Sequence, residues 1–248
     1  MEISDYSGSK LSTAHPREYS MEAGYSRKLS EHMGIGLNIQ YIHSDLGNGS
    51  VGGTTYKAAN AVAADISFYY NGLNKEGQGW TAGAALSNLG SRISYTNDAT
   101  ARDFLPANLG LGLAYTGIAD EDNKWTLSAE GNKLLVPKIP GDSAGLADYH
   151  QMNITKSWGK SFDNSACQFS VGGEYSYMNT FFLRLGYCAQ TRQAGDQKYM
   201  TTGIGLKYAT MRLDLSYLVP SGNGVNRSPI SNTLRLGLVF TLGKHPDL

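Results

Sequence analysis

The sequence predicts an all-β fold, a transmembrane antiparallel β-barrel of which about twelve strands are present. Three observations support this fold class. Segments of the chain alternate apolar residues with small or polar ones, and the connections between these segments are alternately short and long. The 248 residues include 30 glycines and 16 tyrosines but only 7 prolines, a composition that favours strands and tight turns over helices.

The alternation is clearest from Phe181 to Gln190, where every second residue from Phe181 to Ala189 is apolar or aromatic and the intervening positions include Arg184. Successive side chains of a strand point to opposite faces, so one face of this segment is apolar and the other is mixed. The same pattern, with a partial strand near Met1, predicts strands over 19–26, 33–41, 62–68, 80–87, 108–115, 125–130, 169–177, 181–190, 200–208, 211–217 and 233–242.

The connections between the expected strands alternate in length. Short turns are expected at 28–32, 72–77, 117–123, 178–180 and 209–210. Outer-membrane barrels have short periplasmic turns and longer extracellular loops, so we expect the longer connections to face outward. These longer connections are 6–16, 45–55, 94–103, 135–163, 191–197 and 221–231.

The face opposite the apolar one carries charged and amide side chains, which we expect to line a wet lumen. A soluble β-sandwich or a lipocalin-like barrel is the alternative, because its strands alternate with the same period. So many charges would be costly in a dry core but are ordinary in a water-filled lumen. The expected lumenal residues are Glu22, Asn38, Gln40, Asp65, Glu130, Glu174, Arg184, Lys207, Arg212, Asp214 and Arg235.

A turn at 178–180 would set Glu174 opposite Arg184 as a lumenal cross-strand pair. The same register turns Cys167 toward lipid and Cys188 toward the lumen, which argues against a disulfide unless the register slips. Two interpretations of the lumenal charges stay open. They could produce a transverse field that orients a polar passenger, or they could neutralise one another and stiffen the wall.

No catalytic, metal-binding or cofactor-binding pattern is recognisable in the sequence. The five histidines lack the close spacings of a metal site, and no Gly-x-Ser-x-Gly turn frames a nucleophile. The formal net charge is zero and no basic stripe stands out, so nucleic acid is not an expected partner. We therefore expect a protein that is not an enzyme and needs no cofactor.

Ten short segments resemble a known protein family in their actual residues, and not only in their alternation of apolar and polar positions. They are Tyr25–Ser30, Tyr41–Leu46, Ser87–Gly90, Phe104–Gly112, Asn132–Pro137, Leu183–Tyr187, Lys198–Tyr199, Gly203–Tyr208, Leu213–Pro220 and Asn232–Arg235. Taken in this order, they resemble the PorV family of the Bacteroidetes type IX secretion system. The resemblance extends over essentially the whole chain.

The resemblance implies a FadL-like barrel of about fourteen strands in the bacterial outer membrane, a multi-pass protein surrounded by the lipid bilayer. Family members begin with a signal peptide, which the residues after Met1 do not resemble. We therefore expect residues 1–248 to form a single outer-membrane β-barrel domain that lacks the N-terminal segment and the first strands. The resemblance also implies a cell-surface cargo shuttle in protein transport. Such a shuttle binds the C-terminal signal domain of secreted cargo at the translocon barrel and delivers it to the surface attachment complex.

The outward loops, above all the long loop at 135–163, are the expected docking surface, together with lumenal residues near their base. A solvated cap is the alternative for the long loop. For the whole chain, the second functional hypothesis is a FadL-like transporter of hydrophobic small molecules, which would need an apolar interior. The loop residues that we single out are Leu135, Pro137, Pro140, Tyr149 and Trp158.

Overall fold

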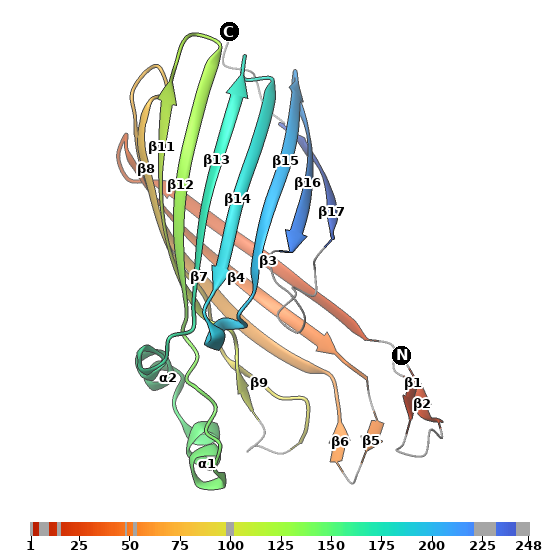
Figure 1. The fold of residues 1–248 in the computed structure, drawn as a ribbon. Helices are drawn as coiled ribbons and strands as arrows, with labels where there is room; N and C mark the ends of the chain where they lie inside the picture. The colour runs from red at the N-terminus through yellow and green to blue at the C-terminus, as the bar shows by residue number, and fades with distance from the viewer. Residues whose placement is uncertain are drawn as a thin grey trace.

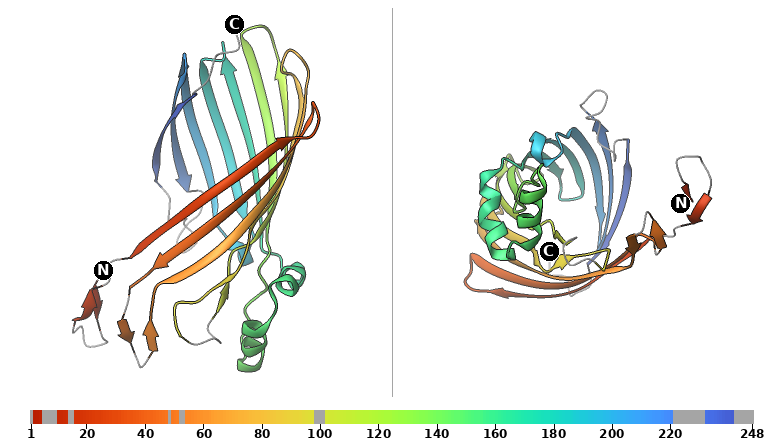
Figure 2. Two further views of the ribbon diagram at one scale, coloured as in Figure 1. Left: turned by 180° about the vertical axis from the view of Figure 1, so that it is seen from behind. Right: turned by 90° about the horizontal axis from the view of Figure 1, so that it is seen from below.

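The computed structural model describes residues 2–4, 10–13, 16–47, 49–51, 54–97, 102–220 and 232–241. Its main feature is an eleven-stranded antiparallel sheet that curves around a central space (Figures 1 and 2). The strands of this sheet lie side by side in the order of the chain. The predicted antiparallel all-β fold is confirmed.

Each strand of the sheet corresponds to a segment with apolar alternation. Near Met1, β1 (Glu2–Ser4) pairs with β2 (Lys10–Thr13) and not with the main sheet. Within the described residues no pairing joins the two outermost strands of the sheet, so both are edges. The eleven strands are β3 (Arg17–Lys28), β4 (Met33–Asp45), β7 (Ala59–Leu73), β8 (Gly79–Gly90), β11 (Asn108–Ile118), β12 (Asn123–Leu134), β13 (Cys167–Tyr177), β14 (Phe181–Gln190), β15 (Lys198–Tyr208), β16 (Met211–Pro220) and β17 (Leu234–Phe240).

The short turns gather at one end of the sheet and the long connections at the other, as the alternation of lengths predicts (Figure 1). The expected long connection at 221–231 lies outside the described residues. Several long connections contain regular structure that the sequence did not reveal. These elements are β5 (Gly49–Val51), β6 (Thr54–Tyr56), β9 (Arg92–Ile93), β10 (Asp103–Phe104), α1 (Ser143–Gln151), α2 (Ile154–Lys160), η1 (Ser161–Asp163) and η2 (Arg192–Ala194).

The concave face of the sheet can be assigned from one small cluster. Strand β9 lies inside the curve of the sheet (Figure 2), and its Ile93 packs against Ala61 and Ala63 of β7, together with Leu105. Odd-numbered residues near the start of β7 therefore face the concave side. The cross-strand register carries this assignment around the sheet, because directly opposed residues share a face.

The convex face is apolar. Leu127 and Phe169 are each 60% exposed, and Leu236 is 74% exposed. An apolar surface of this extent is unfavourable in water, whereas an outward apolar band is the usual exterior of an outer-membrane barrel. Among the described helices, none combines the length and the apolar character that a membrane crossing requires.

The predicted register around the turn at 178–180 is confirmed, since Phe169 lies opposite Ala189 and Glu174 opposite Arg184. Cys188 is buried on the face that also carries Arg184, whereas Cys167 has the opposite parity. Both thiols are free. This arrangement follows from the alternation of side chains along paired strands.

Candidate functional site: the concave wall and the loop-end cap

The concave wall holds an ion-pair network on β13, β14 and β16. Arg184 contacts Glu174 through Nε at 2.6 Å and Asp214 through Nη1 at 2.6 Å. Arg212 adds a second contact to Asp214, at 2.8 Å. Both guanidinium groups also lie over the ring of Phe182, at 5.3 and 5.6 Å from its centroid. The two carboxylates and two guanidinium groups of this network neutralise one another.

Two glycines of β15 make this network possible, because β15 runs between the strands of Arg184 and Asp214. Gly203 lies opposite Arg184 and Gly205 lies opposite Asp214. A Cβ added at Gly205 would stand 2.7 Å from Asp214 Oδ1 and 3.2 Å from Arg184 Nη1. The absence of side chains on this stretch of β15 thus leaves room for Arg184 to cross it.

A second network on β3, β4, β7 and β8 is acidic and bonded to amides. The carboxylate of Asp65 accepts hydrogen bonds from Asn38 Nδ2 at 3.1 Å and from the backbone N–H of Asn88 at 2.8 Å. Asn38 also reaches Glu22, at 3.5 Å, and Gln40 donates to Asn88 Oδ1 at 2.6 Å. No cation of the described residues pairs with these carboxylates.

Asn88 belongs to this acidic network through its contacts with Asp65 and Gln40, although the sequence did not single it out. It has a φ of +57° at an irregularity where the register between β7 and β8 shifts. Asparagine tolerates this left-handed conformation better than most residues. The signal was present in the sequence, because Leu86 and Leu89 are both apolar with two residues between them, which breaks the period of two.

The remaining lumenal candidates are spread along the wall. Glu130 accepts a hydrogen bond from Asn132, which in turn accepts one from Asn108 at 2.8 Å. Lys207 is exposed and lies opposite Arg212, and Arg235 lies opposite Ser216. The structure therefore groups Glu174, Arg184, Arg212 and Asp214, groups Glu22, Asn38, Gln40 and Asp65, and leaves Glu130, Lys207 and Arg235 outside both networks.

At the end of the sheet with the long connections, residues 92–97, 102–104 and 135–163 form a structure that we call the loop-end cap. Phe104 joins its two parts: the Arg92 guanidinium lies over its ring at 4.4 Å, and Tyr149 of α1 meets it edge-on at 5.2 Å. Arg92 also donates to the carbonyl of His150, and the His150 ring donates to the carbonyl of Arg102 at 3.1 Å.

The electrostatics of the cap follow from this packing. Burial lowers the pKa of the Arg92 guanidinium, and the nearby positive charge of Arg102 lowers it further. Burial raises the pKa of the Tyr149 hydroxyl, and the carboxylate of Asp103 adds to that rise. Both residues nevertheless keep their usual charge near neutral pH, since their ordinary pKa values lie far above it.

Lys133 ties the helical part of the cap to the sheet. Its ammonium group donates to Asn164 Oδ1 at 2.8 Å and to the carbonyls of Ser161 and Leu134 at 2.9 and 3.2 Å. Asn164 also donates to the carbonyl of Val136 at 2.8 Å, so the two ends of the long connection meet. Within it, α1 begins after Asp142, whose side chain accepts from Gly145 N–H as an N-cap.

Of the loop residues singled out from the sequence, Leu135, Pro137 and Tyr149 are buried, and Pro140 and Trp158 are half-buried. Their burial shows that they support the cap from within. The large apolar side chains that the cap exposes are Ile139, Leu146 and Phe162. Sequence alone did not separate the two sets, because the helices of this segment carry no strong apolar periodicity.

Outer-membrane β-barrel proteins are built from an antiparallel sheet with an apolar outer face, a polar inner face and long connections at one end. The sheet of this chain has these features on its convex face, its concave face and the end with the long connections. Comparison with protein families supports this class and narrows it. The family described as "Type IX secretion system protein PorV" matches residues 1–141, which is more than half of the chain. The chain belongs to the PorV family. The members of this family are components of a secretion system, and nothing in the match indicates catalysis.

Similarity to solved structures is weaker. The Ralstonia pickettii toluene transporter TbuX has a TM-score of 0.48 and 10% identity, with 87% of this chain and 66% of that chain covered. The P. putida toluene transporter TodX has a TM-score of 0.48 and 12% identity, with coverages of 83% and 64%. The chain thus spans just under two thirds of the length of these two transporters. The NanC porin has a TM-score of 0.39 and 11% identity, with coverages of 90% and 99%. No curated protein matches the sequence.

Proposed function

We propose that this protein is a multi-pass outer-membrane shuttle of the type IX secretion system. In this proposal it binds the C-terminal signal domain of secreted cargo at the translocon barrel and delivers it to the surface attachment complex. It performs no catalysis. The family match supports the secretion role, and the apolar convex face supports a place in the bilayer.

The observation that carries the cargo-binding step is the loop-end cap. Its helices are anchored to the sheet through Lys133 and packed onto the β9–β10 segment through Phe104 and Tyr149. An anchored cap presents a preformed surface, so a partner would not have to order it on binding. Exposed Ile139, Leu146 and Phe162 supply apolar contact area on that surface.

The test is a pull-down from native outer membranes in mild detergent, with identification of the co-purifying proteins. The triple variant Ile139→Ser, Leu146→Ser and Phe162→Ser should capture much less cargo while the translocon barrel still co-purifies. A matched control is the pair Leu29→Ser and Met178→Ser, which removes exposed apolar side chains from short turns at the other end of the sheet.

Two results would count against the proposal. If the unmodified protein brings down neither a translocon barrel nor signal-bearing cargo, the shuttle function is wrong. If it does bring them down and the triple variant captures cargo equally well, the exposed apolar residues of the cap are not the docking surface.

A FadL-like transporter of hydrophobic small molecules is the competing function. It would need an apolar interior, whereas the concave wall carries carboxylates, guanidinium groups and amides. Extraction of lipids from the purified protein discriminates the two functions, because a stoichiometric fatty acid would favour transport.

A further inference from the structure

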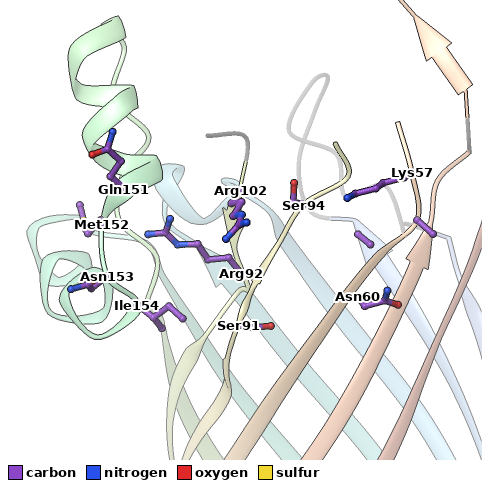
Figure 3. Close-up of a pocket in the computed structure, with 12 residues that line it drawn as sticks. Lys57, Asn60, Ser91, Arg92, Ser94, Arg102, Gln151, Met152, Asn153 and Ile154 are labelled. Atoms are coloured by element: carbon purple, nitrogen blue, oxygen red, sulfur yellow. The ribbon is translucent and has the colours of Figure 1, made fainter. Parts of the chain in front are cut away.

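The loop-end cap and the start of β7 border an open cavity of about 620 Å³ (Figure 3). Three parts of the chain form its walls: the entry into β7, the β9 segment with Arg102, and the link between α1 and α2. Its volume lies within the range of roughly 300–1,000 Å³ that is usual for ligand sites. We call it the cationic cavity. Its lining includes Lys57, Arg92, Arg102, Gln151 and Asn153.

The charges of this cavity have one sign. Lys57, Arg92 and Arg102 line it, and no aspartate or glutamate does among the residues that the structure describes. The ion pairs found among the described residues involve none of these three cations. Asp103 follows Arg102 in the chain, but it lies outside the lining. Like charges that share a cavity repel one another, and an anion placed among them would relieve that repulsion.

The three cations differ in how firmly they are held. Arg92 is fixed by its position over Phe104 and by its donation to the His150 carbonyl. Lys57 and Arg102 are exposed, and no side-chain hydrogen bond of theirs is found in the described part of the chain. Figure 3 shows Arg102 beside Arg92, with Lys57 across the cavity near Ser94. A fixed guanidinium with two adaptable cations around it suits a carboxylate, which accepts several charged hydrogen bonds at once.

We propose that the cationic cavity binds a carboxylate of the cargo's signal domain, either a side chain or the chain terminus. This inference rests on the proposed function and adds to it the chemical group that is recognised. The cavity lies at the end of the sheet with the long connections, and its wall includes Ala59, which is buried on the concave face. A polypeptide held beneath the cap reaches this position, whereas lipid headgroups approach from the convex face.

The test measures binding of a purified signal domain, fused to a carrier protein, to the full-length chain in detergent. The variant is Lys57→Gln with Arg102→Gln, which leaves Arg92 and its contacts in the cap intact. We expect this variant to bind about tenfold more weakly, as the loss of charged hydrogen bonds predicts. A matched control is Lys156→Gln with Lys160→Gln, which removes the same charge from exposed positions of neighbouring α2. Its affinity should stay within about twofold of the unmodified protein.

A second arm identifies the carboxylate. A probe with an amidated C-terminus, and another with its acidic side chains converted to amides, are each tested on both proteins. One of these probes should bind about tenfold more weakly to the unmodified protein, and that loss should vanish in the Lys57→Gln, Arg102→Gln variant, because the two changes remove one interaction.

Each failure has its own signature. If the unmodified protein does not bind the signal domain at all, the proposed function fails and this inference fails with it. If it binds and the double variant binds equally tightly, the cationic cavity is not the site, although the shuttle function stands. If the double variant instead loses co-purifying lipopolysaccharide phosphate and keeps its affinity for the signal domain, the cavity binds lipid and the proposal is overturned.

Discussion

Arg184 reaches Asp214 at 2.6 Å across an intervening strand, although 30 residues separate them in the chain. The contact passes over Gly205, where no side chain stands in the way. This ion pair on the concave face links β14 to β16 directly, in addition to the backbone hydrogen bonds by which both strands pair with β15. The glycine is therefore as much a part of the network as the charges are.

The substitution Gly205→Ala should destabilise the sheet by about 1 kcal/mol, because its Cβ would push the Asp214 carboxylate and the Arg184 guanidinium apart and so break the ion pair between them. The free energy of unfolding can be followed by urea titration of the detergent-solubilised or vesicle-inserted protein. Gly112→Ala is the matched control, since a Cβ at that concave position meets only the Ala129 carbonyl, at 4.0 Å. Equal losses for both variants would contradict the bridging role of Gly205.

At the irregularity in β8, Asn88→Ala should cost more stability than Asn88→Gly. Both variants lose the amide contacts to Gln40 and to the Pro106 carbonyl, but only alanine is strained at a φ of +57°. We expect a difference of about 1 kcal/mol in the free energy of unfolding. If the two variants are equally stable, the backbone conformation of Asn88 makes no contribution of its own.

Removing the ammonium group of Lys133 should loosen the long connection without unfolding the sheet. The variant Lys133→Met keeps an unbranched side chain but loses the donations to Asn164 and to the Ser161 and Leu134 carbonyls. Hydrogen exchange should become faster in α1 and α2 and stay unchanged in β12 and β13. The exposed Lys138→Met is the control, and similar exchange rates in both variants would show that Lys133 is not the anchor.

Asp120 in the short turn between β11 and β12 makes a pH-dependent contribution to folding. The Asn123 side chain donates to its carboxylate at 2.6 Å, and backbone N–H groups of Asp122 and Asn123 add to this, so the pKa of Asp120 is held below its ordinary value of 3.8. A carboxyl whose pKa is lower in the folded state than in the unfolded chain stabilises the folded state. This stabilisation is complete at pH values above the pKa of the unfolded chain. That stabilisation is lost as the pH falls through the lowered pKa.

The variant Asp120→Asn should therefore be less stable than the unmodified protein at neutral pH, and the gap between their unfolding midpoints should shrink below about pH 4. Glu121→Gln in the same turn is the control, because no hydrogen bond to Glu121 is found among the described residues. A gap that stays constant from pH 7 to pH 3 would contradict the role of the Asp120 carboxylate.

The sequence predicted the sheet well because strand alternation is a local property. Phe181 to Gln190 could be assigned from its own residues, and the turn at 178–180 then set Glu174 opposite Arg184 without further information. Membrane barrels strengthen this signal, since lipid on one side and water on the other act on every strand in the same way.

The parts that escaped prediction depend on contacts between distant segments. The contact between Arg184 and Asp214 depends on the missing side chain at Gly205 of β15, which lies between their strands. The cationic cavity is lined by Lys57 and Arg102, which belong to different connections of the chain. The helices of 135–163 are stabilised by capping and by packing onto Phe104 and Lys133. None of these contacts leaves a periodic trace in the chain.

The order of the strands in the sheet bears on how this protein reaches its final state. The eleven strands lie in the sheet in the same order as in the chain. Every pairing in the sheet therefore joins two strands that are consecutive among these eleven. Contacts of short range form with little loop-closure entropy. Assembly in the bilayer can thus advance by one hairpin at a time, with each new hairpin satisfying the backbone groups left open by the last. In the proposed outer-membrane setting, the long connections, and the folded cap above all, have to cross the bilayer together with the hairpins that they join.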